Sequence, residues 1–129
     1  MNKLEQIKQP ILAEFEVFNR KFDASLQSSN PLLSEVISFI KQRKGKMMRP
    51  VLALLMAKMC GEINDSTYYV AISLELLHTA SLVHDDVVDE SDKRRGQSSV
   101  NAVYDNKVSV LVGDYLLATC LANAAMTSN

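Results

Sequence analysis

The sequence predicts an all-α bundle built around a hydrophobic central helix, and two patterns carry that prediction. Only four glycines and three prolines interrupt the 129 residues, so helices can run long between breaks. Apolar side chains also recur every three or four positions, which is the spacing of one face of a helix. No internal repeat and no flexible linker divides the chain, and its length suits a single domain.

The first two expected helices follow from an apolar stripe and a proline cap. The first helix is expected from Leu4 to Leu26, because its apolar residues form one stripe made of Ile7, Ile11, Phe15, Phe18, Phe22 and Leu26. The second should begin at Asn30-Pro31 and run to about Ile40, since asparagine caps helices and proline suits the first helical position. The basic run that follows is expected to form a connector with Gly45.

The middle of the chain predicts two more helices. A very apolar helix is expected to start at Pro50 and to end at Gly61, because glycine favours the residue after a helix. Asp65 or Ser66 is expected to cap a fourth helix that could run to about Ser91.

The last third of the chain contains the one ambiguous segment. Gly96 and its polar neighbours predict a loop. Beyond it, Val108, Val110 and Val112 alternate as in a strand before an alanine- and leucine-rich stretch takes over. No second strand is available to pair with these valines, so we expect one helix over residues 107–126.

Charge is nearly balanced but strongly segregated along the chain. Fourteen Lys and Arg against fifteen Asp and Glu give a net charge of −1, which argues against a generally basic nucleic-acid binder. Five cations fall within nine residues that hold no acid, and five acids crowd into eight. They are Lys41, Arg43, Lys44, Lys46 and Arg49, and Asp85, Asp86, Asp89, Glu90 and Asp92. Such segregation suits a site that handles anions and a metal together.

Cysteine use and hydropathy predict a cytoplasmic protein. Cys60 and Cys120 lie sixty residues apart among apolar neighbours, so we expect two buried free thiols and a reducing compartment. Residues 1–8 are polar and contain no signal-peptide core. The longest uninterrupted apolar runs, at 50–57 and 115–122, are too short to cross a bilayer, so no transmembrane segment is expected.

Three side chains of the fourth helix share one line on its surface. At about 100° per residue, Asp85 and Asp89 fall about 20° to either side of His78. Carboxylates one turn apart can bind a hard cation jointly, and oxygen ligands favour Mg²⁺ or Mn²⁺, with phosphate and water completing the set. Asp92 would continue the line if the helix reached it, whereas Asp86 points roughly 100° away and suits a supporting role.

A plainer interpretation of these acids is a solvated helix end, which is the commoner meaning of an acidic run. Here the acids follow a stretch that is apolar around most of its circumference, so we expect the helix to be buried. Carboxylates at the end of a buried helix need counterions or a metal. Arg94 and Arg95 could serve as counterions by pairing with Asp89 and Asp92.

Three segments resemble motifs of one enzyme family, the trans-polyprenyl diphosphate synthases. Residues 84–96, HDDVVDESDKRRG, resemble its first aspartate-rich motif, DDxxD. Residues 45–50, GKMMRP, resemble its GKxxRP segment, and residues 113–118, GDYLLA, resemble the helix that follows. The motifs occur in the family's order and spacing from about Asn30 to the end of the chain. The resemblance implies the N-terminal portion of a helical bundle of the isoprenoid synthase type.

The resemblance also implies a role for each matching residue in a Mg²⁺-dependent condensation of isopentenyl diphosphate with an allylic diphosphate. Asp85 and Asp89 would bind the Mg²⁺ ions that hold the allylic diphosphate, and Arg94 would contact that diphosphate directly. The diphosphate of isopentenyl diphosphate would be bound by Lys46, Arg49, His78 and Arg95. Taken singly, the lysine and arginines are more often surface residues and the histidine more often a core residue, so only their joint spacing favours a site.

Product length follows from two small residues ahead of the motif. In the family the fourth and fifth residues before the first aspartate shape the floor of the tail pocket, and these are Ser81 and Ala80 here. Small side chains leave the channel open, so a long product of the octaprenyl type that supplies quinone side chains is expected.

The chain departs from the family in one respect, because members are much longer and carry a second aspartate-rich motif that is missing here. We therefore expect residues 1–129 to be the N-terminal part of one synthase domain, inactive alone and, by resemblance, homodimeric. Two alternatives remain: a non-catalytic helical subunit of a heteromeric synthase, and an unrelated helical metal- or phosphate-binding module.

Overall fold

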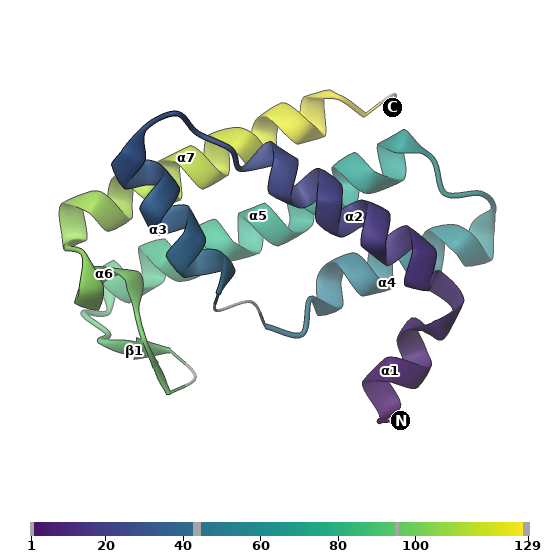
Figure 1. Cartoon of the computed structure of the whole chain (residues 1–129), viewed down its shortest axis with the longest axis horizontal. Coiled ribbons are helices and arrows are strands. Elements are labelled where there is room, and N and C mark those ends of the chain that lie inside the picture. The colour runs from purple at the N-terminus through teal and green to yellow at the C-terminus, as the bar shows by residue number, and fades with distance from the viewer. Residues whose placement is uncertain (1, 43–44, 95, 128–129) are drawn as a thin grey trace.

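The computed structural model describes residues 2–42, 45–94 and 96–127, and its architecture confirms the all-α prediction (Figure 1). One hairpin of two short strands interrupts the helices of the described chain. The elements in chain order are α1 (Lys3–Lys8), the 3₁₀-helix η1 (Gln9–Ile11), α2 (Leu12–Ser25), α3 (Pro31–Lys41), α4 (Met48–Cys60), α5 (Asp65–Val88), β1 (Lys93–Arg94), β2 (Gln97–Ser98), α6 (Val100–Val103) and α7 (Asn106–Ala125).

Helices α5 and α7 lie side by side and antiparallel at the centre of the bundle, and they make its most extensive contact (Figure 1). Helices α2 and α4 pack against α5, while α3 packs against α6 and α7. The largest fully buried side chains come from several of these elements: Phe18, Ile11, Leu54, Ile72, Leu76 and Leu116. The central helix is not buried all round, however, because Leu74 and Leu77 on α5 are 42% and 47% exposed.

The expected first helix is broken into three pieces at Pro10. Proline has no N–H to donate to the preceding turn, so α1 gives way to η1 before α2 begins. Lys58 of α4 donates from Nζ to the Pro10 carbonyl at 2.6 Å, which satisfies the backbone at the break. The apolar stripe is confirmed from Ile11 onward, whereas Ile7 is 44% exposed.

Asparagine side chains cap three of the described helices, with Asn2 at α1, Asn30 at α3 and Asn64 at α5. The Asn30 side chain accepts a hydrogen bond from the Leu33 amide at 3.0 Å, as the sequence predicted for α3. At α5 the cap is Asn64, and the predicted caps Asp65 and Ser66 are wrong. The Asn64 side chain accepts a hydrogen bond from the Thr67 backbone amide at 3.1 Å, and the Asn64 backbone amide donates to Thr67 Oγ1. The two residues therefore form a capping box, in which each side chain pairs with the other residue's backbone N–H.

Helix α4 begins at Met48, two residues before the predicted start at Pro50, and ends before Gly61 as predicted. Pro50 is tolerated in this first turn because amides there have no partner within the helix. Met47 precedes the helix in the left-handed region, with φ 55°, and its side chain is buried.

Helix α5 ends at Val88, three residues before the predicted end at Ser91. Glu90 adopts a positive φ of 54°, which stops the helix. The Glu90 amide donates to the Val87 carbonyl, and the Ser91 amide donates to the Asp86 carbonyl. These two hydrogen bonds form a Schellman motif, which usually has glycine at the position that Glu90 occupies. Asp92 therefore lies beyond the helix.

The predicted loop around Gly96 is a tight hairpin in which β1 pairs antiparallel with β2. Gly96 has φ 77°, a conformation that favours glycine. The segment after it is helical, as predicted: Val112 is buried, Val108 half-buried and Val110 exposed along α7.

The burial of the two cysteines differs from the prediction. Cys120 is buried, with Sγ 3.2 Å from the Ser73 carbonyl, but Cys60 is exposed because it ends α4 at the surface. Helix α7 is long and apolar enough by length and composition to cross a membrane, although the core helix of a soluble protein passes the same test. Polar residues are interspersed along α7, so its sequence contains no long uninterrupted apolar run. The expectation of no transmembrane segment stays a prediction.

Candidate functional site

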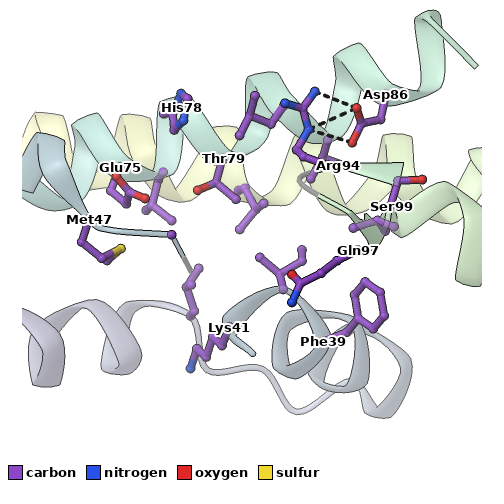
Figure 2. A pocket seen from close by; sticks show the side chains of 18 of the residues that line it. Phe39, Lys41, Met47, Glu75, His78, Thr79, Asp86, Arg94, Gln97 and Ser99 are labelled. Atoms are coloured by element: carbon purple, nitrogen blue, oxygen red, sulfur yellow. Dashed lines mark hydrogen bonds and ion pairs between the residues drawn. The ribbon is translucent and has the colours of Figure 1, made fainter. Parts of the chain in front are cut away.

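One cavity of about 500 Å³ is lined by most of the cations that the sequence singled out. Figure 2 shows His78 and Arg94 among its lining side chains. Most of its wall comes from α3, the connector before α4, the first turn of α4, α5 and the hairpin, and α2, α6 and α7 add single residues or pairs. Four predicted ligands line it: Lys46, Arg49, His78 and Arg94. Arg95, the fifth, lies outside the described residues, as do Arg43 and Lys44 of the basic run.

Helical periodicity explains the wall that α5 contributes. The side chains that line the cavity recur every three or four residues, so they share one face of the helix: Glu75, His78, Thr79, Leu82, Val83 and Asp86. On the opposite wall the left-handed Met47 turns the chain into α4, with Lys46 just before it and Arg49 in the first helical turn. Three cations of the run at residues 41–49, which contains no acid, thus line the cavity: Lys41, Lys46 and Arg49.

Asp86 and Arg94 form the most specific polar contact of the site (Figure 2). Arg94 Nη2 donates to Asp86 Oδ1 at 2.7 Å, and Arg94 Nε lies 3.2 and 3.1 Å from the two carboxylate oxygens. The Asp86 side chain is 6% exposed and that of Arg94 is 38% exposed. The hydrogen bonds to Asp86 raise the pKa of the Arg94 guanidinium, so this cation is permanent. The suggestion that Arg94 pairs with Asp89 or Asp92 is therefore wrong.

Asp85 and Asp89 lie one turn apart at the end of α5, and both are exposed outside the cavity. The Asp89 amide donates to the Asp85 carbonyl at 2.8 Å, which keeps the two residues in helical register. Their charges contribute to the raised pKa of Arg94, so they lie within electrostatic reach of the cavity's edge. Asp92 does not extend their line: it lies in the loop, where its carbonyl accepts from the Ser99 amide.

Two exposed carboxylates one turn apart fit a hard divalent cation. Across residues 2–42, 45–94 and 96–127, no cluster of three or more His, Cys, Asp or Glu side chains could hold a metal on its own. Mg²⁺ is nevertheless commonly held by only one or two carboxylates, with substrate phosphates and water as its other ligands. The donor set of Asp85 and Asp89 suits such a site.

The two residues expected to govern product length face different ways. Ala80 is 2% exposed and belongs to the core. Ser81 is exposed, and its Oγ donates to the Leu77 carbonyl at 2.9 Å. Ser81 lies one turn before Asp85, on the side of α5 that also exposes Leu74 and Leu77.

Several cavity residues had no place in the sequence prediction. Glu75 and Thr79 lie 11 and 7 residues before Asp86, so helical periodicity could have found them. Phe39, Gln97 and Ser99 also line the cavity, but they come from α3, the hairpin and the N-cap of α6, and only the fold brings them there.

In a comparison with protein families, the model described as polyprenyl synthetase matches residues 30–129. The all-trans-nonaprenyl-diphosphate synthase (geranyl-diphosphate specific) of Rhodobacter capsulatus is 41% identical over 115 residues, 88% of this chain and 35% of that protein. The heptaprenyl diphosphate synthase component 2 of Bacillus subtilis is 41% identical over 109 residues, 84% of this chain and 31% of that protein. The chain thus spans about a third of the length of the curated relatives it matches.

Solved structures agree with this assignment of fold. A decaprenyl diphosphate synthase from Rhodobacter capsulatus superposes with a TM-score of 0.90 at 36% identity, covering 98% of this chain and 39% of that one. A polyprenyl synthase from Caulobacter crescentus, complexed with calcium and isoprenyl diphosphate, gives a TM-score of 0.88 at 30% identity, covering 95% of this chain and 38% of that one.

Proposed function

The chain belongs to the polyprenyl synthetase family, and from this premise we propose that residues 1–129 form the N-terminal part of a trans-prenyltransferase domain. The reaction is the Mg²⁺-dependent condensation of isopentenyl diphosphate with an allylic diphosphate to a long-chain polyprenyl diphosphate. One observation carries the proposal: four cations chosen from sequence line a single cavity, next to an exposed pair of carboxylates. Family membership excludes the alternative of an unrelated metal- or phosphate-binding module.

We assign the cavity to the diphosphate of isopentenyl diphosphate, with Lys46, Arg49 and His78 as its ligands. Arg95 remains a proposed ligand from the sequence motif. The Arg49 guanidinium can bind two phosphate oxygens at once and so orient the diphosphate, whereas the Lys46 ammonium supplies a compact charge that attracts it.

Asp85 and Asp89 are proposed to hold the Mg²⁺ that binds the allylic diphosphate. The bound metal would neutralise the charge that develops on the departing diphosphate. Arg94, whose charge is permanent, would contact the same diphosphate. Calcium in the Caulobacter crescentus structure supports a divalent cation, and oxygen ligands of this number favour Mg²⁺.

The chain's own residues promote the reaction by position and charge. The carbon–oxygen bond of the allylic diphosphate breaks and the diphosphate leaves with the bonding pair. Arg94 stabilises the negative charge that develops on the leaving diphosphate, and preorganised cations lower the barrier mainly by this electrostatic effect. Lys46 and Arg49 hold the isopentenyl unit while its double bond forms the new carbon–carbon bond, and loss of a proton completes the step.

A long product is supported by the exposed side of α5. Ser81 is small and exposed one turn before Asp85, and exposed apolar side chains continue along that side at Leu77, Leu74 and Val70. A growing apolar tail gains free energy by covering such a surface, at about 25 cal/mol per Å². The names of the relatives, heptaprenyl to decaprenyl synthases, agree with this direction. Ala80 is core, so we assign the effect to Ser81.

The partners and compartment of the protein are also proposals. The exposed apolar residues of α4, α5 and α7 support association with the rest of a synthase domain and with a second copy in a homodimer. The free, buried Cys120 supports a cytoplasmic location. Light scattering and cell fractionation test these two proposals.

A second candidate is a subunit of a heteromeric synthase, favoured by the relative named heptaprenyl diphosphate synthase component 2. Such a subunit would purify together with a different, larger chain. Purification of a tagged chain from its native cells, followed by mass spectrometry, separates this candidate from a homomeric enzyme.

The experiment that tests the main proposal is isopentenyl transfer by the full-length gene product. Labelled isopentenyl diphosphate, an allylic diphosphate and Mg²⁺ should yield long polyprenyl diphosphates, and chelation of Mg²⁺ should stop the reaction. A polypeptide of residues 1–129 alone should be inactive, because one wall of the site would be missing. Failure of the full-length product to extend any allylic diphosphate would refute the proposed activity.

A further inference from the structure

We propose that Asp86 is a positioning residue that orients Arg94 toward the allylic diphosphate, and that it is not a ligand of the metal. The inference rests on the proposed function, and it divides the three aspartates of the motif between two tasks. Asp85 and Asp89 hold the cation, while Asp86 holds the arginine.

The geometry of the pair fixes the plane of the guanidinium. Two of its nitrogens, Nε and Nη2, donate to the same carboxylate, with Nη2 at 2.7 Å from Asp86 Oδ1. A two-point contact of this kind fixes both the position and the tilt of the arginine. Within the part of the chain that the structure describes, no hydrogen bond uses the Nη1 donors of Arg94. The residue lines the cavity, and its side chain stays 38% exposed.

Burial separates Asp86 from the other two aspartates. Its side chain is 6% exposed, and both of its oxygens accept from Arg94. A metal would have to compete with Arg94 for this nearly buried carboxylate, and loss of the arginine contact would leave a charge without its partner. Asp85 and Asp89 are exposed and need no such disruption.

The same contact fastens the hairpin to the central helix. Arg94 belongs to β1 and Asp86 to α5, so their bond ties the two elements together beside the cavity. Gln97 and Ser98 of β2 line the cavity, and the next residue, Ser99, donates from Oγ to the Ser91 carbonyl at 2.8 Å. Loss of Asp86 should therefore loosen one wall of the cavity as well as the arginine.

The test compares substitutions in the full-length gene product. Asp86→Asn keeps the shape of the side chain but removes its charge. Arg94→Lys keeps the positive charge but removes the guanidinium that makes the two-point contact. We expect each to raise the KM for the allylic diphosphate about tenfold or more, which is the usual worth of a hydrogen bond to a charged group. The Mg²⁺ concentration for half-maximal rate should stay unchanged, and the double variant should be no worse than Arg94→Lys, because both changes break one contact. Lys93→Gln, exposed on the same strand and outside the cavity, is the matched control.

A second readout does not depend on turnover. Hydrogen exchange of the amides in 93–98 should speed up in Asp86→Asn and in Arg94→Lys, but not in Asp85→Asn. The proposal is overturned if Asp86→Asn raises the Mg²⁺ requirement as Asp85→Asn does, if the two single effects add, or if the hairpin exchanges at its original rate. If the unsubstituted protein transfers no prenyl group, the proposed function fails, and hydrogen exchange alone then decides whether Asp86 holds Arg94.

Discussion

The imidazole of His84 occupies the space into which any side chain on Gly113 would have to project. His84 Nε2 lies 3.2 Å from the Val110 carbonyl and 3.3 Å from Asp114 Oδ1, so the ring bridges α5 and α7. His84 immediately precedes Asp85. The close approach of α5 and α7 at Gly113 therefore fixes the position of α5 just before Asp85, the first proposed metal ligand.

Gly113→Ala should destabilise the protein. A Cβ would overlap the His84 ring, which would have to move and give up both of its contacts on α7. Overpacking of this kind costs about 1–3 kcal/mol, partly offset by about 1 kcal/mol from the better helix propensity of alanine. We expect a net loss of about 1 kcal/mol in the free energy of unfolding by urea denaturation.

Gly61→Ala is the matched control, because a Cβ there meets no atom within 4 Å and its φ is extended. Its effect should stay within about 0.5 kcal/mol. A stabilised Gly113→Ala variant would mean that the histidine ring moves aside freely and does not fix the two helices.

Asp85→Asn should weaken the response to Mg²⁺. Removal of one of two carboxylates lowers the affinity for the cation, so a steady-state titration should show half-maximal rate at a higher Mg²⁺ concentration and a maximal rate lower by about 10²-fold or more. Asp92→Asn is the control, since Asp92 lies beyond the end of α5 in the loop. An equal effect of the two substitutions would contradict the assignment of the metal ligands.

Ser81→Phe should shorten the product of the full-length enzyme. Ser81 is exposed one turn before Asp85, so an aromatic ring there would block the side of α5 assigned to the growing tail. Chromatography of the dephosphorylated products measures the change. Met59→Phe, at a position 79% exposed at the far end of α4, should leave the length distribution as it was. An unchanged product from Ser81→Phe would remove this role.

The two cysteines should differ in reactivity. Burial raises the pKa of the Cys120 thiol, so its thiolate is scarcer at neutral pH, whereas Cys60 is exposed. A thiol reagent at pH 7.5 should modify one cysteine rapidly in the folded protein, and Cys60→Ser should abolish that reaction. Rapid modification of Cys120 would show that the contact between α5 and α7 opens readily.

The sequence predicted helices well where short-range rules decide the structure, and less well where packing does. The Asn30 cap and the break before Gly61 depend on neighbours in sequence, and both are confirmed. The end of α5 was missed because it depends on a positive φ at Glu90, a residue with no special preference for that conformation. The hairpin around Gly96 has strands of two residues, too short for any periodicity to reveal.

The candidate site was predictable in its residues but not in its contacts. The resemblance to the family's motifs selected Lys46, Arg49, His78 and Arg94, and the fold brings all four to one cavity. Helical geometry placed Asp86 off the metal-binding line but could not identify its partner, because Arg94 reaches it only through the turn after α5 and the hairpin. Long-range geometry of this kind has no signature in local sequence.

Binding of isopentenyl diphosphate to the cavity tests the central claim most directly. Calorimetric titration of the full-length gene product should give a Kd that rises about tenfold or more in Arg49→Gln and again in the Lys46→Gln, Arg49→Gln double variant, since each loses a charged hydrogen bond to phosphate. Lys93→Gln, a cation outside the cavity, should bind as the unsubstituted protein does. Equal affinity in all four proteins would contradict the assignment of this cavity to the diphosphate.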